Sequence, residues 1–276
     1  MKSRNSIRLK RLLFELLFAA LSMLILLPLA LMILGSFKTS PEAARLTLDW
    51  PDNWLWDNYQ VVYDRGKVGR AMMNSVLLTF SSVAIVTTVS GMAAFYLVRR
   101  NTLLNRVVQQ LFMIGLIAPL SIITTLQVLQ TIGLYGTYIS VIFVFVSLHM
   151  PFSVFLFSGF VKTVPREVEE AGEIDGCGSL RLFFSVVFPL LMPVVTTCAI
   201  INFMGIWNDF TVPLFFLNQS DKWTMPLTVY NFFGMYASDW NLVFADLLLT
   251  TAPVAIVYIV GQRFIMNGMT AGAVKG

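Results

Sequence analysis

Long apolar segments, separated by short charged ones, dominate the pattern of this chain. Residues 16–37, 71–98 and 107–161 each contain no Asp, Glu, Lys or Arg. Because a helix needs about 20 apolar residues to cross a bilayer, the first two each predict one span. The third is long enough for two spans, with a break at 132–138. With further spans at about 184–207 and 242–263, the pattern predicts an all-α membrane protein with six transmembrane helices.

The composition agrees with this class. Charged residues make up 12% of the chain and hydrophobic residues 57%, whereas soluble globular proteins carry about 25% charged residues. The first apolar segment follows a basic stretch, as in a secretory signal peptide, but it is too long for one and no small-residue cleavage site follows it. We therefore expect residues 1–37 to form a cytoplasmic N-terminus and a retained first span.

The distribution of Lys and Arg predicts the orientation. With the N-terminus in the cytoplasm, 13 of the 19 basic residues fall on the cytoplasmic side. Since cytoplasmic loops are enriched in Lys and Arg, both termini are expected there. The basic residues lie at span ends and form no nucleic-acid-binding face. The parts that follow the first span are an extracytoplasmic loop at 38–70, a five-helix core at 71–264 that includes a cytoplasmic loop at 163–185, and a cytoplasmic tail at 265–276.

The cytoplasmic loop contains an acidic stretch that such an apolar chain does not need for insertion. Pro165 is expected to start a short helix whose first turns hold Glu167, Glu169 and Glu170, where carboxylates complement the helix dipole. Gly176 and Gly178 can end this helix with positive φ. The simplest alternative is a solvated acidic loop.

A second helix is expected to begin at Arg181 and to be bent by Pro189 and Pro193 as it enters the membrane. The pattern therefore predicts a helix–turn–helix below the bilayer. Such an element can transmit force when a partner binds it.

The order of residues in this loop resembles the loop motif of ABC importer permeases, which is Glu-Ala-Ala, three residues, Gly, nine residues, Ile, one residue, Leu-Pro. The matching positions are Glu170, Ala171, Gly172, Gly176, Val186, Phe188 and Pro189. Gly172, Val186 and Phe188 depart from the motif, all by small or apolar replacements. The stretches WNDF at 207–210, DWNLVFA at 239–245 and QRFIMNGMTAGAVKG at 262–276 are similar to the carbohydrate-uptake branch, namely the smaller permease of maltose-type importers.

This resemblance implies a type I ABC importer transmembrane fold in a bacterial inner membrane and binding-protein-dependent import of a sugar or oligosaccharide. It implies that the loop at 165–189 couples the chain to a separate ATPase. The residues assigned to this role are Glu169, Glu170, Ala171, Gly172, Asp175, Gly176 and Pro189. The implied partners are a second homologous permease, two ATPase subunits and an extracytoplasmic solute-binding protein.

The chain has no phosphate-binding G-x-x-x-x-G-K-[ST] loop, so ATP and Mg are expected on the separate ATPase and no cofactor is expected here. A single His and no Cys/His cluster argue against a metal site and against a membrane enzyme. A stand-alone secondary transporter, driven by an ion gradient, is the main alternative. It would need intramembrane carboxylates, and Asp209 and Asp246 are the candidates.

Polar residues near the spans are candidates for a solute path, because burying them unpaired is costly. Amides and aromatic faces suit sugars, and the candidates are Asn202, Trp207, Asn208 and Asp209. The alternative for each is hydrogen bonding between helices. The roles of His149 and Asp246 stay open from the sequence.

Overall fold

The computed structural model describes residues 2–100, 102–234 and 238–273, and every regular element of four or more residues in these ranges is a helix. The prediction of an all-α chain is confirmed. The chain divides into two compact units: one is formed by residues 1–68 with 228–251, and the other by 69–227 with 252–276. We call them the first and second unit.

The first unit joins the end of the N-terminal helix to the polar segment at 38–70. Its helices are α1 (Lys2–Ser36), α2 (Ser40–Ala44), α3 (Asp57–Arg65) and the first part of α13 (Trp240–Ala273). The Asn58 amide donates to the carbonyls of Ser36 and Lys38 at 2.8 and 3.0 Å, and it thereby satisfies carbonyls that the end of α1 leaves without helical partners. The Asn241 amide of α13 donates to Asn58 Oδ1 at 3.0 Å. The polar segment is therefore folded onto α1 and α13.

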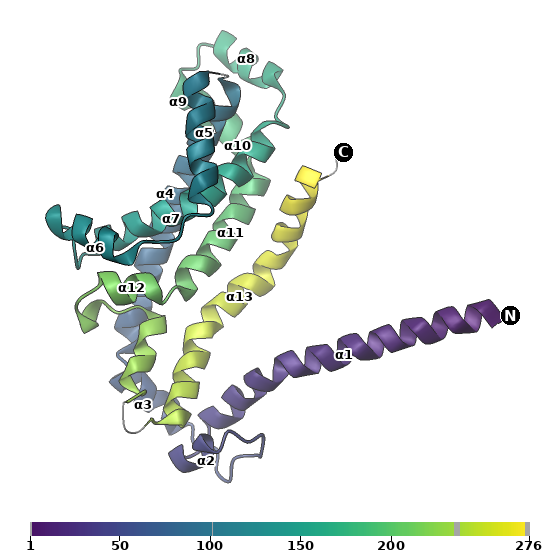
Figure 1. Cartoon of the computed structure of the whole chain (residues 1–276), viewed down its shortest axis with the longest axis vertical. Helices are drawn as coiled ribbons and strands as arrows, with labels where there is room; N and C mark the ends of the chain where they lie inside the picture. The colour runs from purple at the N-terminus through teal and green to yellow at the C-terminus, as the bar shows by residue number, and fades with distance from the viewer. Residues whose placement is uncertain (1, 101, 235–237, 274–276) are drawn as a thin grey trace. The chain divides into compact units, whose positions relative to one another are not determined.

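The second unit holds most of the helices and the acidic loop. Its helices are α4 (Val68–Arg99), α5 (Leu103–Gly115), α6 (Ile122–Thr131), α7 (Tyr138–Val161), α8 (Arg166–Ile174), α9 (Ser179–Leu182), a π-helical turn (Phe183–Val187), α10 (Phe188–Leu190), α11 (Met192–Asn208), α12 (Thr211–Phe216) and the rest of α13. Short 3₁₀ turns follow at Ser220–Lys222 and Met225–Asn231. Within this unit, α8 lies at one end, beyond the ends of α4 and α7 (Figure 1).

Four described helices are long and apolar enough to cross a membrane, and the bent pair α9–α10 with α11 provides a fifth candidate. The four are Phe14–Ser36, Val68–Arg99, Tyr138–Val161 and Trp240–Phe264. The predicted span in the first half of 107–161 is divided instead into α5 and α6. Pro119 lies between them, and proline lacks the N–H that a continuous helix needs and disfavours helix in the residue before it.

The fifth candidate is sharply bent. Its two parts, Ser179–Leu190 and Met192–Asn208, meet at 82° around Leu191. Pro189 and Pro193 lie in the first turns of α10 and α11, where a missing N–H costs least. The two prolines therefore bend this segment, as the sequence predicts.

Side chains of the second unit pack in two apolar clusters. The cluster nearer α8 includes Phe157, Val161, Phe183, Val187 and Leu191, all almost fully buried. The other cluster joins residues of α4, α7, α11 and α12. The first cluster contains the π-helical turn that directly follows α9, so the base of the acidic loop is packed into the bundle.

Candidate functional site

Helix α8 is the candidate site, and its two ends follow from local sequence. Pro165 precedes it with an extended ψ of 138°, and Glu167 and Glu169 lie in its first turn, where negative charge is favoured. At the other end Gly176 adopts a φ of +79°. The Gly176 N–H donates to the Glu173 carbonyl and the Cys177 N–H to the Gly172 carbonyl, each at 3.0 Å. These two bonds form a Schellman motif, which requires the left-handed residue that glycine supplies most easily.

The other predicted glycine behaves differently. Gly178 has a φ of −67° and precedes α9, so the expectation that it also ends α8 with positive φ is wrong. The second helix begins at Ser179, two residues before the predicted Arg181. One left-handed residue already reverses the chain, and Gly178 then occupies the extended position that precedes a helix.

One side of α8 is fixed to the end of α4. Arg99 and Glu169 form an ion pair in which their side chains are only 14% and 12% exposed. The Arg99 Nε donates to Glu169 Oε1 at 2.7 Å, and its Nη2 both contacts the same oxygen and donates to the Val164 carbonyl at 2.7 Å. A single guanidinium therefore holds both the helix and the residues that precede it.

Gly172 fixes the same side of α8 to α9 and to the π-helical turn. A Cβ built on this buried glycine would lie 2.5 Å from Leu182 Cδ1 and 3.7 Å from Val186 Cγ2. A side chain at residue 172 would force the end of the Leu182 side chain to move, so the glycine favours this close approach. Two separated parts of the sequence motif, at Gly172 and Val186, therefore lie against each other.

The opposite side of α8 is exposed. It presents Glu170, Ala171, Glu173 and Ile174, and the Ile174 side chain is 85% exposed. Asp175 and Gly176 extend this surface at the end of the helix. Carboxylates around an exposed apolar side chain form a surface that suits a groove with basic walls and an apolar floor.

The structure separates two neighbouring glutamates that the sequence treats alike. Glu169 is buried against Arg99, whereas Glu170 is exposed. Pro189 is exposed in α10, beyond the π-helical turn. In the sequence, Arg99 contributes only to the excess of basic residues that predicts the orientation. The adjacent arginines at 99 and 100 gave no signal of which one turns inward.

The four candidates for a solute path are placed in different surroundings. Asn202 is fully buried: its amide donates to Ser153 Oγ at 3.0 Å and to Cys198 Sγ at 3.2 Å, and His149 Nδ1 donates to its Oδ1 at 3.0 Å. Trp207 is almost fully buried and stacks on Phe203. These side chains join α7 and α11 or pack within α11.

The remaining two candidates lie at the end of α11. Asp209 accepts a hydrogen bond from the Val212 N–H at 2.7 Å and so caps α12, while the Asn208 side chain is exposed. Of the four, Asn208 is thus the most exposed within the second unit, and Asp209 is half-buried. Contact of any of them with a solute stays a prediction. Within the described ranges, no group of three or more His, Cys, Asp or Glu side chains could hold a metal ion.

Comparisons with known proteins agree with the resemblance found in the loop. A family model described as "Binding-protein-dependent transport system inner membrane component" matches residues 86–270. The chain is 34% identical over 237 residues to the melibiose/raffinose/stachyose import permease protein MelC of Bacillus subtilis. The aligned region covers 83% of this chain and 86% of MelC. It is 31% identical over 258 residues to the diacetylchitobiose uptake system permease protein NgcG of Streptomyces coelicolor, with 92% and 85% covered.

The fold also has a solved counterpart. A crystal structure of a bacterial ABC transporter involved in the import of the acidic polysaccharide alginate contains a chain that superposes with a TM-score of 0.81 and covers 94% of this chain and 97% of its own length. At 18% identity this shows the fold. The relatives are transport permeases, which confirms the prediction of a transport component rather than an enzyme. The chain belongs to the family of inner membrane components of binding-protein-dependent transport systems.

Proposed function

We propose that this chain is a permease subunit of an ATP-driven ABC importer for a sugar or oligosaccharide, and that α8 couples it to a separate ATPase. The observation that carries the proposal is the two-sided character of α8. One side is fixed to the bundle by the Arg99–Glu169 pair, and the other presents exposed carboxylates and Ile174. The names of the relatives, which concern melibiose-type sugars and diacetylchitobiose, support the substrate class.

The proposed topology has six spans and places both termini and α8 in the cytoplasm of a bacterium. In addition to the five candidate spans, α5 and α6 together form one more, the third in chain order. The short link that contains Pro119 joins them. The excess of Lys and Arg on the proposed cytoplasmic side supports this orientation. Of the tail predicted at 265–276, the described part belongs to α13 as far as Ala273, and residues 274–276 lie outside the described residues.

Coupling requires that a displacement of α8 moves the spans. The Arg99 guanidinium connects α8 to the end of α4, and the contact of Gly172 with Leu182 connects it to the bent fifth span. Both connections are short and largely buried, so α8 cannot tilt without moving these two helices or breaking the contacts. In this proposal two ATPase subunits bind ATP and Mg and move α8 as they close. A second permease completes the path, and a solute-binding protein delivers the cargo.

The proposal is tested by reversing the charge of Glu170. In the Glu170→Lys chain the Arg99–Glu169 pair is untouched, but the exposed surface of α8 carries a positive charge toward a groove that is proposed to be basic. Loss of one charge-assisted contact, worth about 1.5–3 kcal/mol, should weaken association with the co-expressed ATPase roughly 10–100-fold. The matched control is Asp64→Lys, an equal charge change at an exposed residue of α3.

The measurement is co-purification of the ATPase with each chain in detergent and the rate of solute-dependent ATP hydrolysis in liposomes. We expect Glu170→Lys to lose both ATPase co-purification and solute-dependent ATP hydrolysis, and Asp64→Lys to keep both. Equal ATPase association of the two variants would overturn the coupling role of α8. Uptake by this chain alone in liposomes with an ion gradient would instead support a secondary transporter.

A further inference from the structure

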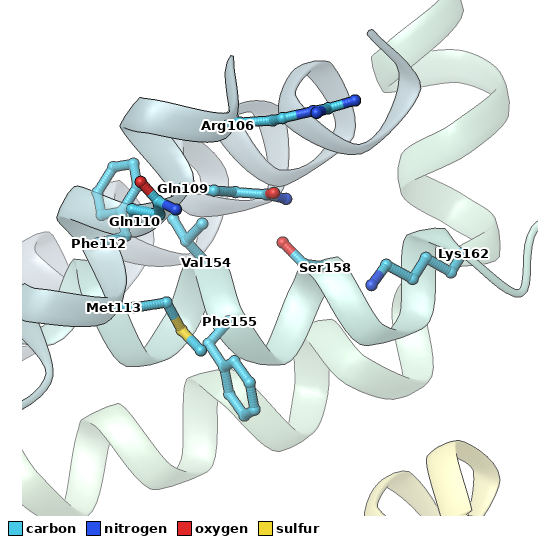
Figure 2. A pocket seen from close by; sticks show the side chains of 9 residues that line it. All are labelled: Arg106, Gln109, Gln110, Phe112, Met113, Val154, Phe155, Ser158 and Lys162. Atoms are coloured by element: carbon cyan, nitrogen blue, oxygen red, sulfur yellow. The ribbon is translucent and has the colours of Figure 1, made fainter. Parts of the chain in front are cut away.

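Between α5 and α7 the second unit contains a pocket that crosses the end of a membrane span. The two helices approach closely at one point, where a Cβ on Gly115 would lie 3.0 Å from Pro151 Cγ. Further along, between Arg106 and Lys162, they leave a pocket of about 390 Å³ (Figure 2). This pocket is separate from the exposed side of α8 and from the solute-path candidates.

One part of the pocket is apolar and lies at membrane depth. Met113, Phe155 and Val154 line it, and the last two belong to the span Tyr138–Val161. Figure 2 shows the Met113 and Phe155 side chains close together on the side of the pocket away from Lys162. The other part is cationic and polar, lined by Arg106, Lys162 and Ser158. Lys162 directly follows the last residue of the span.

The cationic part continues into a second pocket of about 280 Å³ that shares Arg106, Gln109 and Lys162 with the first and adds Arg100 and Arg166. Neither pocket has an Asp or Glu among its lining residues. Four basic side chains from α5, α8 and the ends of α4 and α7 therefore surround one region at the membrane boundary.

We propose that these joined pockets bind an anionic phospholipid, with its phosphate between Arg106 and Lys162 and an acyl chain along Met113 and Phe155. From Phe155 to Lys162 the helix rises by about 10 Å, which is about the distance between the upper part of an acyl chain and the phosphate. Basic pockets between transmembrane helices at the membrane surface are suited to anionic headgroups. A soluble phosphate would satisfy the cationic part but leave the apolar part without a ligand. An acidic protein surface would likewise leave the part at membrane depth unused.

The experiment is native mass spectrometry of the purified full chain in detergent, with dioleoylphosphatidylglycerol and dioleoylphosphatidylcholine added in equal amounts. The test variant is Arg106→Gln with Lys162→Gln. The control is Arg45→Gln with Arg65→Gln, which removes the same charge from exposed residues outside both pockets. We expect the unmodified chain and the control to prefer phosphatidylglycerol. In the test variant the ratio of bound phosphatidylglycerol to bound phosphatidylcholine should fall about 30-fold, since each basic residue near a membrane surface raises the affinity for anionic lipid about fivefold.

Three further readouts keep the test decisive. Binding of phosphatidylcholine should be similar in all three chains, and this shows that the test variant is folded. Inorganic phosphate at millimolar concentration should not displace bound phosphatidylglycerol; displacement would show a simple anion site and overturn the lipid assignment. An unchanged lipid preference in the test variant would also overturn the lipid assignment. If that variant in addition failed to co-purify with the ATPase, the basic residues would be assigned to binding a protein instead.

Discussion

Replacing Gly176 by Ala isolates the backbone contribution to the shape of the loop that contains α8. Nothing lies within 4 Å of a Cβ built at Gly176, so the substitution causes no clash, and the only cost is the φ of +79°. A left-handed conformation costs a non-glycine residue about 1–2 kcal/mol. Because Ala also restricts the unfolded chain, which returns part of this, we expect a net loss of about 1 kcal/mol, or about fivefold in the local opening equilibrium.

Gly178→Ala is the matched control. Its Cβ also meets open space, but its φ is −67°, which Ala adopts without strain. Ala is a poorer residue than Gly before a helix, and this loss is similar in size to the gain from restricting the unfolded chain. The control should therefore leave the loop close to its original stability. Two alanines placed two residues apart are thus expected to act differently for one physical reason.

Hydrogen exchange followed by mass spectrometry measures the effect directly, because the Gly176 and Cys177 amides make the two hydrogen bonds of the turn. Peptides that cover residues 166–182 should exchange about fivefold faster in the Gly176→Ala chain and at an unchanged rate in the Gly178→Ala chain. Peptides from α4 and α7 should not change in either. Equal exchange rates in the two variants would refute the claim that the left-handed residue fixes the end of α8.

Two other predictions concern buried polar contacts. Glu169→Gln should lower the stability of the full chain by about 2 kcal/mol, because it leaves the Arg99 charge largely buried without its counter-ion. Glu170→Gln should change the stability by less than about 0.5 kcal/mol. Equal shifts of the thermal midpoint of the two variants in one detergent would contradict the distinction between the two glutamates. Asn202→Ala should cost about 1 kcal/mol and show a nonadditive energy with Ser153→Ala, because the two side chains share a buried hydrogen bond. Full stability of Asn202→Ala together with lost transport would instead point to contact with the solute.

Much of the fold is visible in the sequence because membrane spans need length and apolarity, and both can be read along the chain. The segments at 71–98 and 242–263 correspond to the candidate spans Val68–Arg99 and Trp240–Phe264. The turn at Gly176 was also predictable, because glycine after a short acidic helix is a local signal. Pro119 is the sequence signal for the division between α5 and α6. Because the residues around Pro119 are apolar, the pattern alone predicts one continuous span there.

The parts of the site that depend on packing could not be predicted. Whether Arg99 or Arg100 faces Glu169 depends on the rotation of α4, which a segment without charges does not define. The burial of Asn202 depends on its approach to Ser153 and His149 in another helix, far away in sequence. Gly178 shows the limit of a local rule, because one left-handed residue was enough and the second glycine was free to precede α9.

We propose that α8 faces the cytoplasm and contacts an ATPase there. A single cysteine at the most exposed apolar residue of α8 tests it: Ile174→Cys in a chain whose Cys177 and Cys198 are replaced by Ala. We predict that a membrane-impermeant thiol reagent labels this cysteine in inverted vesicles but not in intact cells, and that a short cross-linker joins it to the co-expressed ATPase. Labelling from outside the cell, or a transporting complex that gives no cross-link to an ATPase, would contradict the account.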